Sequence, residues 1–358
     1  MFVPDGRASA RRAAAPAPEA PTSGLARSNR VRTAWVLAAL ALLLLVSVAS
    51  VVVGTRLIAP DVVWQVLWHP DASQESIIVH DLRLPRTLLG IAAGASLGLA
   101  GALIMALTRN PLADPGILGV NAGAAFTVTI AVGAFGLASF YQYVWFSFAG
   151  AVAATIAVYL IGSAGRGGPT PVRLTLAGVA LGAVLGGVSS GITLLDPEAF
   201  DVMRGWFAGS LAGRDMEIVL QTLPFLAVGI VTALLLARSL NAVALGDDLA
   251  AAVGVNIGRT RVAGIVAVTL LCGASTAVAG PIGFVGLMIP HIARWLLGPD
   301  QRWIFAFTVV AAPSLLLLAD IAGRLVVRPT EVEAGLVTAL IGAPVLIALV
   351  RRRRVSGL

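Results

Sequence analysis

The sequence predicts an all-α integral membrane protein with about ten transmembrane helices. First, 58% of its 358 residues are hydrophobic, only 12% are charged, and the mean hydropathy is +0.92. Second, long apolar runs alternate with short segments that are rich in charge, proline and glycine. Third, most of the arginines lie in every second one of the segments that flank the apolar runs. A soluble core could not bury so much apolar surface, whereas lipid accepts it.

A span is expected wherever about 20 predominantly apolar residues run together. The first run is too long for the hydrophobic part of a signal peptide and lacks a convincing cleavage site, so we expect it to be retained. One run, which begins near Phe284, is shorter than the others. In chain order, the expected spans are 34–54, 84–107, 117–133, 143–161, 174–194, 218–237, 262–279, 284–296, 304–323 and 335–350.

The arginines predict the orientation, because positively charged loops are retained in the cytoplasm. With the N-terminus inside, the cytoplasmic segments hold 18 of the 25 arginines and the outer segments hold 7. The sequence therefore predicts a multi-pass protein of the cytoplasmic membrane with both termini cytoplasmic. Residues 1–33, rich in Ala, Pro and Arg, are expected to form a disordered cytoplasmic tail, 34–350 the transmembrane domain, and 351–358 a basic cytoplasmic tail.

An internal repeat relates two of the expected spans. The pattern GASxxxAG begins at Gly94 and again at Gly273, in spans that should run in opposite directions. This favours an inverted repeat, an arrangement that is frequent in transporters. Small residues also suit any close packing of helices in lipid, and that alternative explains the five matched positions about as well.

The residues give little support to catalysis. All 25 basic residues are arginine, so the chain cannot supply the lysine of a Walker A phosphate loop, and ATP would have to be hydrolysed by another chain. His69, His80 and His291 are scattered, and no metal or nucleophile motif accompanies them. We expect His291 to bond backbone carbonyls at a helix end and Cys272 to be a small core residue. We therefore expect that the chain is not an enzyme, that it binds no metal or cofactor, and that it has no nucleic-acid partner.

An ion-coupled secondary carrier is the alternative from another class. Such carriers place acidic groups or broken helices near the membrane midplane. Only Asp320 approaches that description, and Arg324 follows it by four residues. An ion pair along one helix is the simpler interpretation of Asp320.

Three motifs carry a resemblance to a known family. They are RLPR at 83–86, RNPLADPGILGV at 109–120 and GPIGFVGLMIPH at 280–291. From about residue 35 to 350 the chain resembles the FecCD family, the permeases of type II ATP-binding-cassette (ABC) importers for iron-siderophores, heme and cobalamin. The segment LLDPEAF at 194–200, followed by GSLAGRD at 209–215, is closest to the ferric-siderophore permeases.

The resemblance implies a fold and a set of partners. The fold would be the cobalamin-permease-like fold of type II importers, with its inverted repeat. The partners would be a second permease, identical or related, two cytoplasmic ATP-binding subunits that hold ATP and magnesium, an external substrate-binding protein, a ferric siderophore as cargo, and the lipid bilayer. Heme and cobalamin are the alternative cargoes.

One inner segment is predicted to couple the chain to the ATPase. Residues 244–253 can form a short amphipathic helix, with two aspartates favouring its N-terminal end and Gly254 ending it. The segment resembles the coupling helix of the family, although an ordinary surface helix is the alternative. The candidate coupling residues are Ala244, Leu245, Gly246, Asp247, Asp248, Leu249, Val253, Gly254 and Val255.

Two inner loops are similar to the cytoplasmic gates of the family. Asn110 and Leu112 follow the second span, and Pro171 and Val172 precede the fifth. Across a dimer these residues could close the pore. Asn-Pro and proline-rich sequences also form plain turns, which is the alternative.

The outer side offers two further sites. Arg83, Arg86 and Arg324 stand out against acidic outer loops, and the resemblance implies that they receive glutamates of the binding protein. Alternatively, they snorkel or pair with Asp81 and Asp320. The segment 200–211 resembles the short external helix at the pore mouth. Its Trp206 and Phe207 are candidate mouth residues or, alternatively, interfacial belt anchors.

Overall fold

The structure, a computed structural model, describes residues 25–26, 28–137, 139–164, 170–327 and 329–355, with side chains up to residue 348. Within these ranges the chain is helical and contains no strand. The apolar helices of the bundle are α1 (Asn29–Val52), α4 (Leu84–Thr108), α5 (Val120–Phe135), α6 (Phe140–Ser163), α7 (Pro171–Leu195), α9 (Met216–Val243), α11 (Ile257–Ala279), α12 (Val285–Leu297), α13 (Gln301–Val326) and α14 (Ala334–Val355). The shorter elements between them are α2 (Pro60–Trp68), α3 (Gln74–Ile77), the π-helical turn η1 (Ile78–Arg83), the 3-10 turn η2 (Pro115–Leu118), α8 (Pro197–Ala208) and α10 (Asp247–Ala252).

The apolar helices confirm the predicted spans within a few residues. Seven helices in the described part are long and apolar enough to cross a membrane, and α5, α12 and the apolar part of α14 are shorter. Helix α1 begins at Asn29 rather than at 34, because Ser28 caps it by accepting a hydrogen bond from Val31. Helix α14 continues to Val355, past the predicted span end at 350. Of the other expected tail residues, 1–24, 27 and 356–358 lie outside the described residues.

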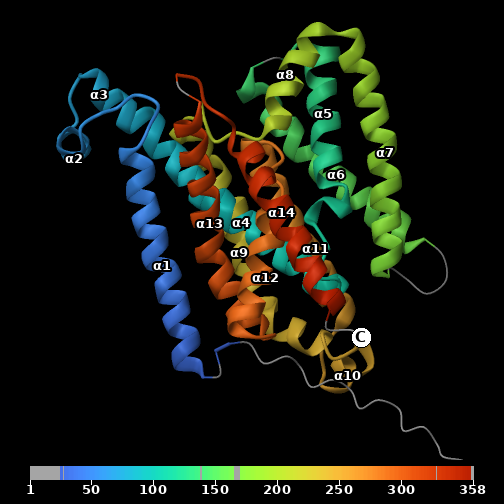
Figure 1. The fold of residues 1–358 in the computed structure, drawn as a ribbon. Coiled ribbons are helices and arrows are strands. Elements are labelled where there is room, and N and C mark those ends of the chain that lie inside the picture. The colour runs from blue at the N-terminus through green and yellow to red at the C-terminus, as the bar shows by residue number, and fades with distance from the viewer. Residues whose placement is uncertain (1–24, 27, 138, 165–169, 328, 356–358) are drawn as a thin grey trace, which may run out of the picture.

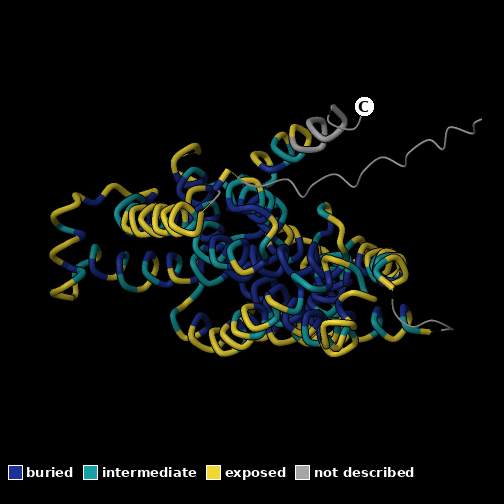
Figure 2. The backbone as a smooth tube through the Cα atoms, turned by 90° about the horizontal axis from the view of Figure 1, so that it is seen from below, coloured by how far each residue is buried: buried dark blue, intermediate teal, exposed yellow. Residues whose placement is uncertain are grey.

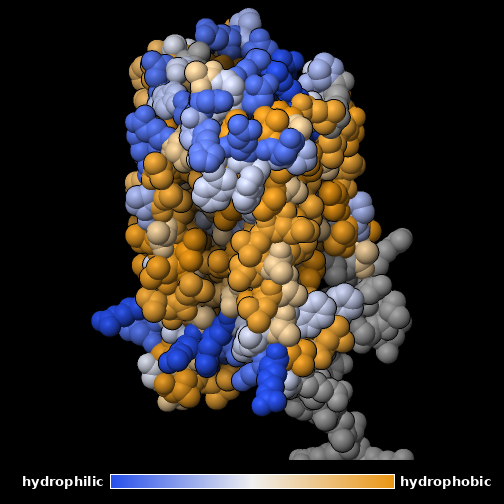
Figure 3. All heavy atoms as spheres, turned by 90° about the vertical axis from the view of Figure 1, so that its left-hand side faces the viewer, coloured by the Kyte–Doolittle hydropathy of each residue, from blue (hydrophilic) through white to orange (hydrophobic). Residues whose placement is uncertain are grey.

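The bundle has two polar ends. One end carries α10, the start of α1 and the end of α14, and is called the α10 end; the opposite one is called the α8 end (Figure 1). On the face shown in Figure 3, a broad hydrophobic band separates the hydrophilic residues of the two ends. The buried backbone lies in the middle of the bundle and the exposed residues lie on its rim (Figure 2). This is the architecture of a multi-pass membrane protein.

Helix α4 lies at the centre of the bundle, in contact with α9, α11, α12 and α13. Its glycines allow this close packing. A Cβ at Gly94 would overlap the backbone of Pro313 in α13, and one at Gly101 would overlap the carbonyl group of Gly286 in α12. Small residues are therefore required here so that the helix backbones can touch.

Two short helices occupy matching places in the two halves of the chain. Helix α5 follows α4, and α12 follows α11. One copy of the GASxxxAG pattern lies in α4, and the other lies at the end of α11 and closes at its C-cap, Gly280. The backbone turns to positive φ just before each short helix, at Gly119 (φ 76°) and Phe284 (φ 67°). Helices α4 and α11 are antiparallel, because α4 ends where α11 begins, at the α10 end. Such a pair fits the predicted inverted repeat, and interrupted segments in corresponding positions are typical of transporters.

Candidate coupling and gate site

The first part of the site is the coupling segment, residues 244–255, at the α10 end. Its helix is shorter than the predicted 244–253, because the first residues continue as a turn from α9 and α10 covers only Asp247–Ala252. Gly246, with φ 120°, redirects the chain before the helix begins. Gly254, with φ 82°, ends the helix as predicted.

The coupling segment turns apolar side chains outward. Leu245, Leu249 and Val253 are 71%, 58% and 71% exposed, while Ala250 is buried against the bundle. The neighbouring Ala244 and Asp248 are also exposed, and Val255 is half-buried. Three exposed apolar residues on one short segment at a polar end are typical of a protein contact surface.

Asp247 ties the coupling segment to two helices of the bundle. One carboxylate oxygen accepts a hydrogen bond from Arg109, the residue that ends α4. The other oxygen accepts from Nη2 of Arg261, near the start of α11, at 2.7 Å. The two carboxylate oxygens thus hold two guanidinium groups that come from different helices.

The loop after α4, residues 109–114, is the first predicted gate element. Arg109 adopts a left-handed conformation (φ 52°) and turns the chain away from the helix. The side-chain oxygen of Asn110 then accepts from the backbone N–H of Leu112 at 3.0 Å, which is the turn chemistry expected of Asn-Pro. This turn leaves the Leu112 side chain exposed at the tip of the loop.

The start of α7 is the second predicted gate element. Thr170 caps the helix by accepting from the N–H of Arg173, and Pro171 occupies the first helical position, where its missing N–H costs nothing. The side chain of Val172 is exposed. Each gate element thus carries one exposed aliphatic side chain at the α10 end, Leu112 in the first and Val172 in the second.

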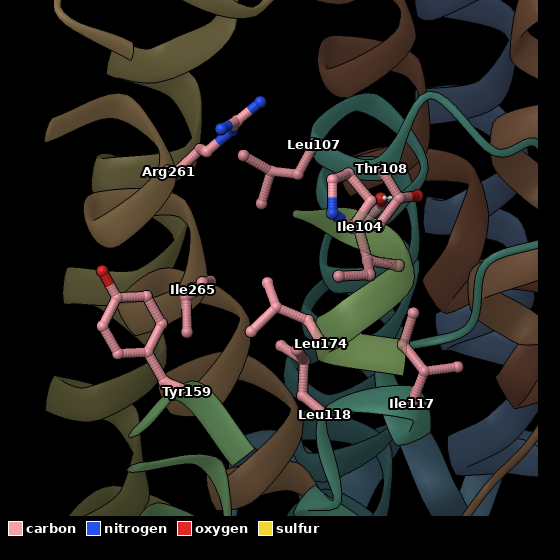
Figure 4. A pocket seen from close by; sticks show the side chains of 10 residues that line it. Ile104, Leu107, Thr108, Ile117, Leu118, Tyr159, Leu174, Arg261 and Ile265 are labelled. Atoms are coloured by element: carbon pink, nitrogen blue, oxygen red, sulfur yellow. Dashed lines mark hydrogen bonds between the residues drawn. The ribbon is translucent and has the colours of Figure 1, made fainter. Parts of the chain in front are cut away.

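A small cavity of about 20 Å³ lies between the two gate elements. Thr108 and Leu118 line it from either side of the first gate loop, Pro171 and Leu174 line it from α7, and Arg261 lines it from α11. Figure 4 shows the aliphatic side chains gathered around this space, with Arg261 at one edge. The cavity therefore borders Pro171 of the second gate element and the residues that flank the first, next to a partner of Asp247, whereas Asn110, Leu112 and Val172 do not line it.

At the α8 end, two of the three predicted docking arginines belong to a buried ion cluster. Asp320 is fully buried and pairs with Arg324, four residues along α13, as predicted. Asp320 also accepts from Arg86 at 2.7 Å, and Arg86 binds Glu331 at 2.8 Å. Arg324 is 2% exposed and also donates to the carbonyl oxygen of Ser50 in α1. The cluster thus joins α1, α4 and α13.

Arg83 is held differently. Its guanidinium group donates to the backbone carbonyls of Val51, Val52 and Arg56, and among the described residues it forms no ion pair with a carboxylate. The donors of all three predicted docking arginines therefore point inward, as the alternative of internal pairing anticipated for Arg86 and Arg324. A docking role for these arginines stays a prediction.

A cavity of about 410 Å³ adjoins this cluster. Arg83, Arg86 and Arg324 line it together with Arg56, which pairs with Glu75 at 3.1 Å. Glu331 also lines it. Counting the ion-pair partners, four arginines face three carboxylates (Glu75, Asp320 and Glu331), which leaves an excess of one positive charge.

The two aromatic residues predicted at the pore mouth lie in different environments. Both belong to α8, and their rings contact edge to face. Trp206 is buried beneath the helix, whereas Phe207 is exposed. Trp206 therefore serves packing, and of the pair only Phe207 is available at the surface.

Two further side chains lie outside the site. A ring nitrogen of His291 is bonded to a backbone carbonyl as expected, that of Leu287, but in the middle of α12 rather than at a helix end. Cys272 is buried in α11.

Sequence reasoning missed three arginines. Arg109 and Arg261 were seen only as inner positive charges, and Arg56 only as an outer one. Arg109 opens the RNPLADPG motif, which is the one signal that could have drawn attention to it. Nothing in the sequence indicates that it meets a residue 138 positions later.

Comparisons with known proteins agree on one family. Residues 42–352 match the FecCD transport family. The ferric enterobactin transport system permease protein FepD of Escherichia coli (strain K12) is 50% identical over 319 residues, covering 89% of this chain and 95% of that protein. The probable siderophore transport system permease protein YfiZ of Bacillus subtilis (strain 168) is 39% identical, covering 90% of this chain and 98% of that protein.

A solved structure agrees with this result. It is described as an inward-facing conformation of a metal-chelate type ABC transporter, and its chain aligns with a TM-score of 0.77 at 27% identity. The alignment covers 89% of this chain and 99% of that chain.

The Asp320 cluster generates a prediction about stability. Asp320→Asn removes the charge that two arginines share, and breaking a buried pair in this way costs about 3–5 kcal/mol. We expect a clear loss of resistance to thermal unfolding in detergent micelles. Asp201→Asn is the control, because Asp201 pairs with Arg204 on the surface, and it should change little. Equal stability of the two variants would show that the cluster does not support the fold.

Proposed function

We propose that this chain, which belongs to the FecCD transport family, is the membrane-spanning permease of an ABC importer that carries ferric siderophores. The observation that carries the proposal is the 50% identity to a ferric enterobactin permease along nearly the full length of both chains. The proposal is also supported by the exposed apolar side chains of the coupling segment and of the two gate elements.

The energy source would be a separate ATPase. The chain has no lysine and so cannot form a Walker A loop, so ATP and magnesium would bind to partner subunits. Leu245, Leu249 and Val253 offer an apolar surface on which such a subunit can dock. The permease itself would then act in transport and not as an enzyme.

The second partner would be another permease, either a copy of this chain or a related one. Helix α7 supports this, because it is mostly exposed and because a Cβ at Gly186, Gly187 or Gly191 would meet nothing within 4 Å. Glycine on an open helix face lets another helix approach closely in a membrane, whereas lipid gives no reason for it. The gate residue Val172 lies at the start of the same helix, so pairing through α7 would bring two gates together.

The α10 end would face the cytoplasm. The arginine asymmetry of the sequence supports this orientation, since the loops of the α10 end hold most of the positive charge. The cytoplasmic ATPase would then meet the coupling segment directly. The α8 end would face the outside of the cytoplasmic membrane, where the binding protein delivers the cargo.

The ferric siderophore is favoured over the alternative cargoes by the similarity to FepD and YfiZ. A hemin permease, HmuU of Yersinia pestis, is 33% identical, well below FepD. The ion-coupled carrier loses its only support, because Asp320 is fully buried and held between two arginines.

A binding protein would dock over the cavity at the α8 end. Its excess positive charge attracts an acidic side chain, although Arg83 and Arg324 are too deeply held to reach outward. Arg56 is the most exposed arginine of the cavity, and it pairs only at the surface with Glu75. Arg56 would therefore make the first contact with the acidic group, because the donors of Arg86 are taken by Asp320 and Glu331.

Uptake into proteoliposomes tests the function. Vesicles containing the permease and its ATPase are supplied with binding protein loaded with a ferric siderophore, hemin or cobalamin. We expect uptake of the ferric siderophore. This uptake should require internal ATP, should be inhibited by vanadate and should be unaffected by a proton ionophore. Uptake that survives vanadate and stops with the ionophore would indicate a secondary carrier. ATP-driven uptake of hemin or cobalamin alone would refute the cargo.

Salt-sensitive binding tests the docking surface. Arg56→Glu reverses one charge of the cavity, so binding of the purified binding protein to permease in nanodiscs should weaken severalfold at low salt and less at high salt. The control is Arg204→Glu on α8, which reverses an exposed charge outside the cavity at the same end. Equal affinities for the two variants would place the docking surface elsewhere.

A further inference from the structure

The ion pairs of Asp247 connect three parts of the protein that lie far apart in the sequence. Asp247 is the first residue of α10, within the coupling segment. Arg109 is the first residue of the first gate loop, and Arg261 belongs to α11. Both arginines reach the same carboxylate group, one at each oxygen.

Each arginine leads to one of the gate elements. The backbone of Arg109 runs directly into the Asn110 turn, so any displacement of its guanidinium group acts on that loop. Arg261 lines the small cavity together with Pro171, the first residue of α7. In the described part of the chain, Nε of Arg261 is buried without a hydrogen-bond partner. Asp247 is therefore the main polar anchor that fixes the position of this side chain.

The common role of an aspartate at a helix start is to offset the helix dipole. Asp248 could serve that purpose equally well, and it forms no ion pair among the described residues. The dipole therefore does not explain why Asp247 points into the bundle and holds two arginines. A mechanical link between the helix and the bundle explains it.

We propose that Asp247 is a positioning residue that transmits movement of the coupling segment to both gate elements, through Arg109 and through Arg261. The proposal rests on the proposed function, because it assumes that an ATPase moves the coupling segment. The three side chains are 41%, 41% and 24% exposed, for Asp247, Arg109 and Arg261 respectively. Water can therefore screen the pairs, and they can break and form again within each transport cycle.

The test compares transport with ATP hydrolysis in the same proteoliposomes. Asp247→Asn keeps the size of the side chain and removes its charge. Coupling between two sites is commonly about 5- to 150-fold, so we expect about tenfold fewer siderophore molecules imported per ATP hydrolysed. The ATPase should still copurify, since its docking surface is the apolar one. Asp247→Glu, which retains the charge, should recover part of the ratio.

Two further variants separate the link from a structural role. Arg109→Gln cuts the branch of the link that runs through Arg109, so it should lower the ratio as well, and the double variant should be little worse than Asp247→Asn alone. The matched control is Arg259→Gln, an exposed arginine of the same end and the same helix as Arg261, which should keep the wild-type ratio.

Several outcomes would overturn the proposal. They are an unchanged ratio in Asp247→Asn, an equal loss in Arg259→Gln, full additivity in the double variant, and loss of ATPase copurification in Asp247→Asn, which would make Asp247 a docking residue. Failure of the proposed function looks different, because the wild-type complex itself would then show no ATP-driven uptake.

Discussion

The close packing of α4 is the constraint on which the rest of the structure depends. Its glycines let the backbones of α12 and α13 touch it, so the helix has little freedom to bend or shift on its own. Its two ends carry arginines that bind carboxylates from other elements: Arg86 binds Asp320 and Glu331, and Arg109 binds Asp247. Helix α4 therefore runs, closely packed, from the cavity at the α8 end to the first gate loop at the α10 end.

Much of the fold could be predicted because a segment that spans the lipid must be apolar and helical, and hydropathy identifies such segments directly. The expected spans recovered the apolar helices, including the short α12 that begins beside Phe284. Prediction failed where a single backbone angle decides a boundary. The left-handed Gly246 moves the start of the coupling helix from 244 to Asp247, and no composition rule reveals that angle in advance.

The site was predictable only in its parts. Turn chemistry located the Asn110 loop and the start of α7, and small residues with two aspartates located the coupling segment. The contacts that join these parts were hidden, because Asp247 meets Arg109 only through the packing of distant helices. The same limit applied at the α8 end, where the sequence marked Arg83 as an outer charge and the structure directs it onto the carbonyls of α1.

The central claim is that the loop at the end of α4 is a gate that moves when the ATPase acts. The most direct measurement is disulfide crosslinking of Leu112→Cys, in a Cys272→Ser background, between two copies of the permease in the assembled importer. Leu45→Cys on the exposed rim of α1 is the control and should not crosslink. The account predicts a crosslink across the two copies whose yield differs severalfold between the nucleotide-free and vanadate-trapped states. An active importer that gives the same Leu112 yield in both states, or none in either, would contradict it.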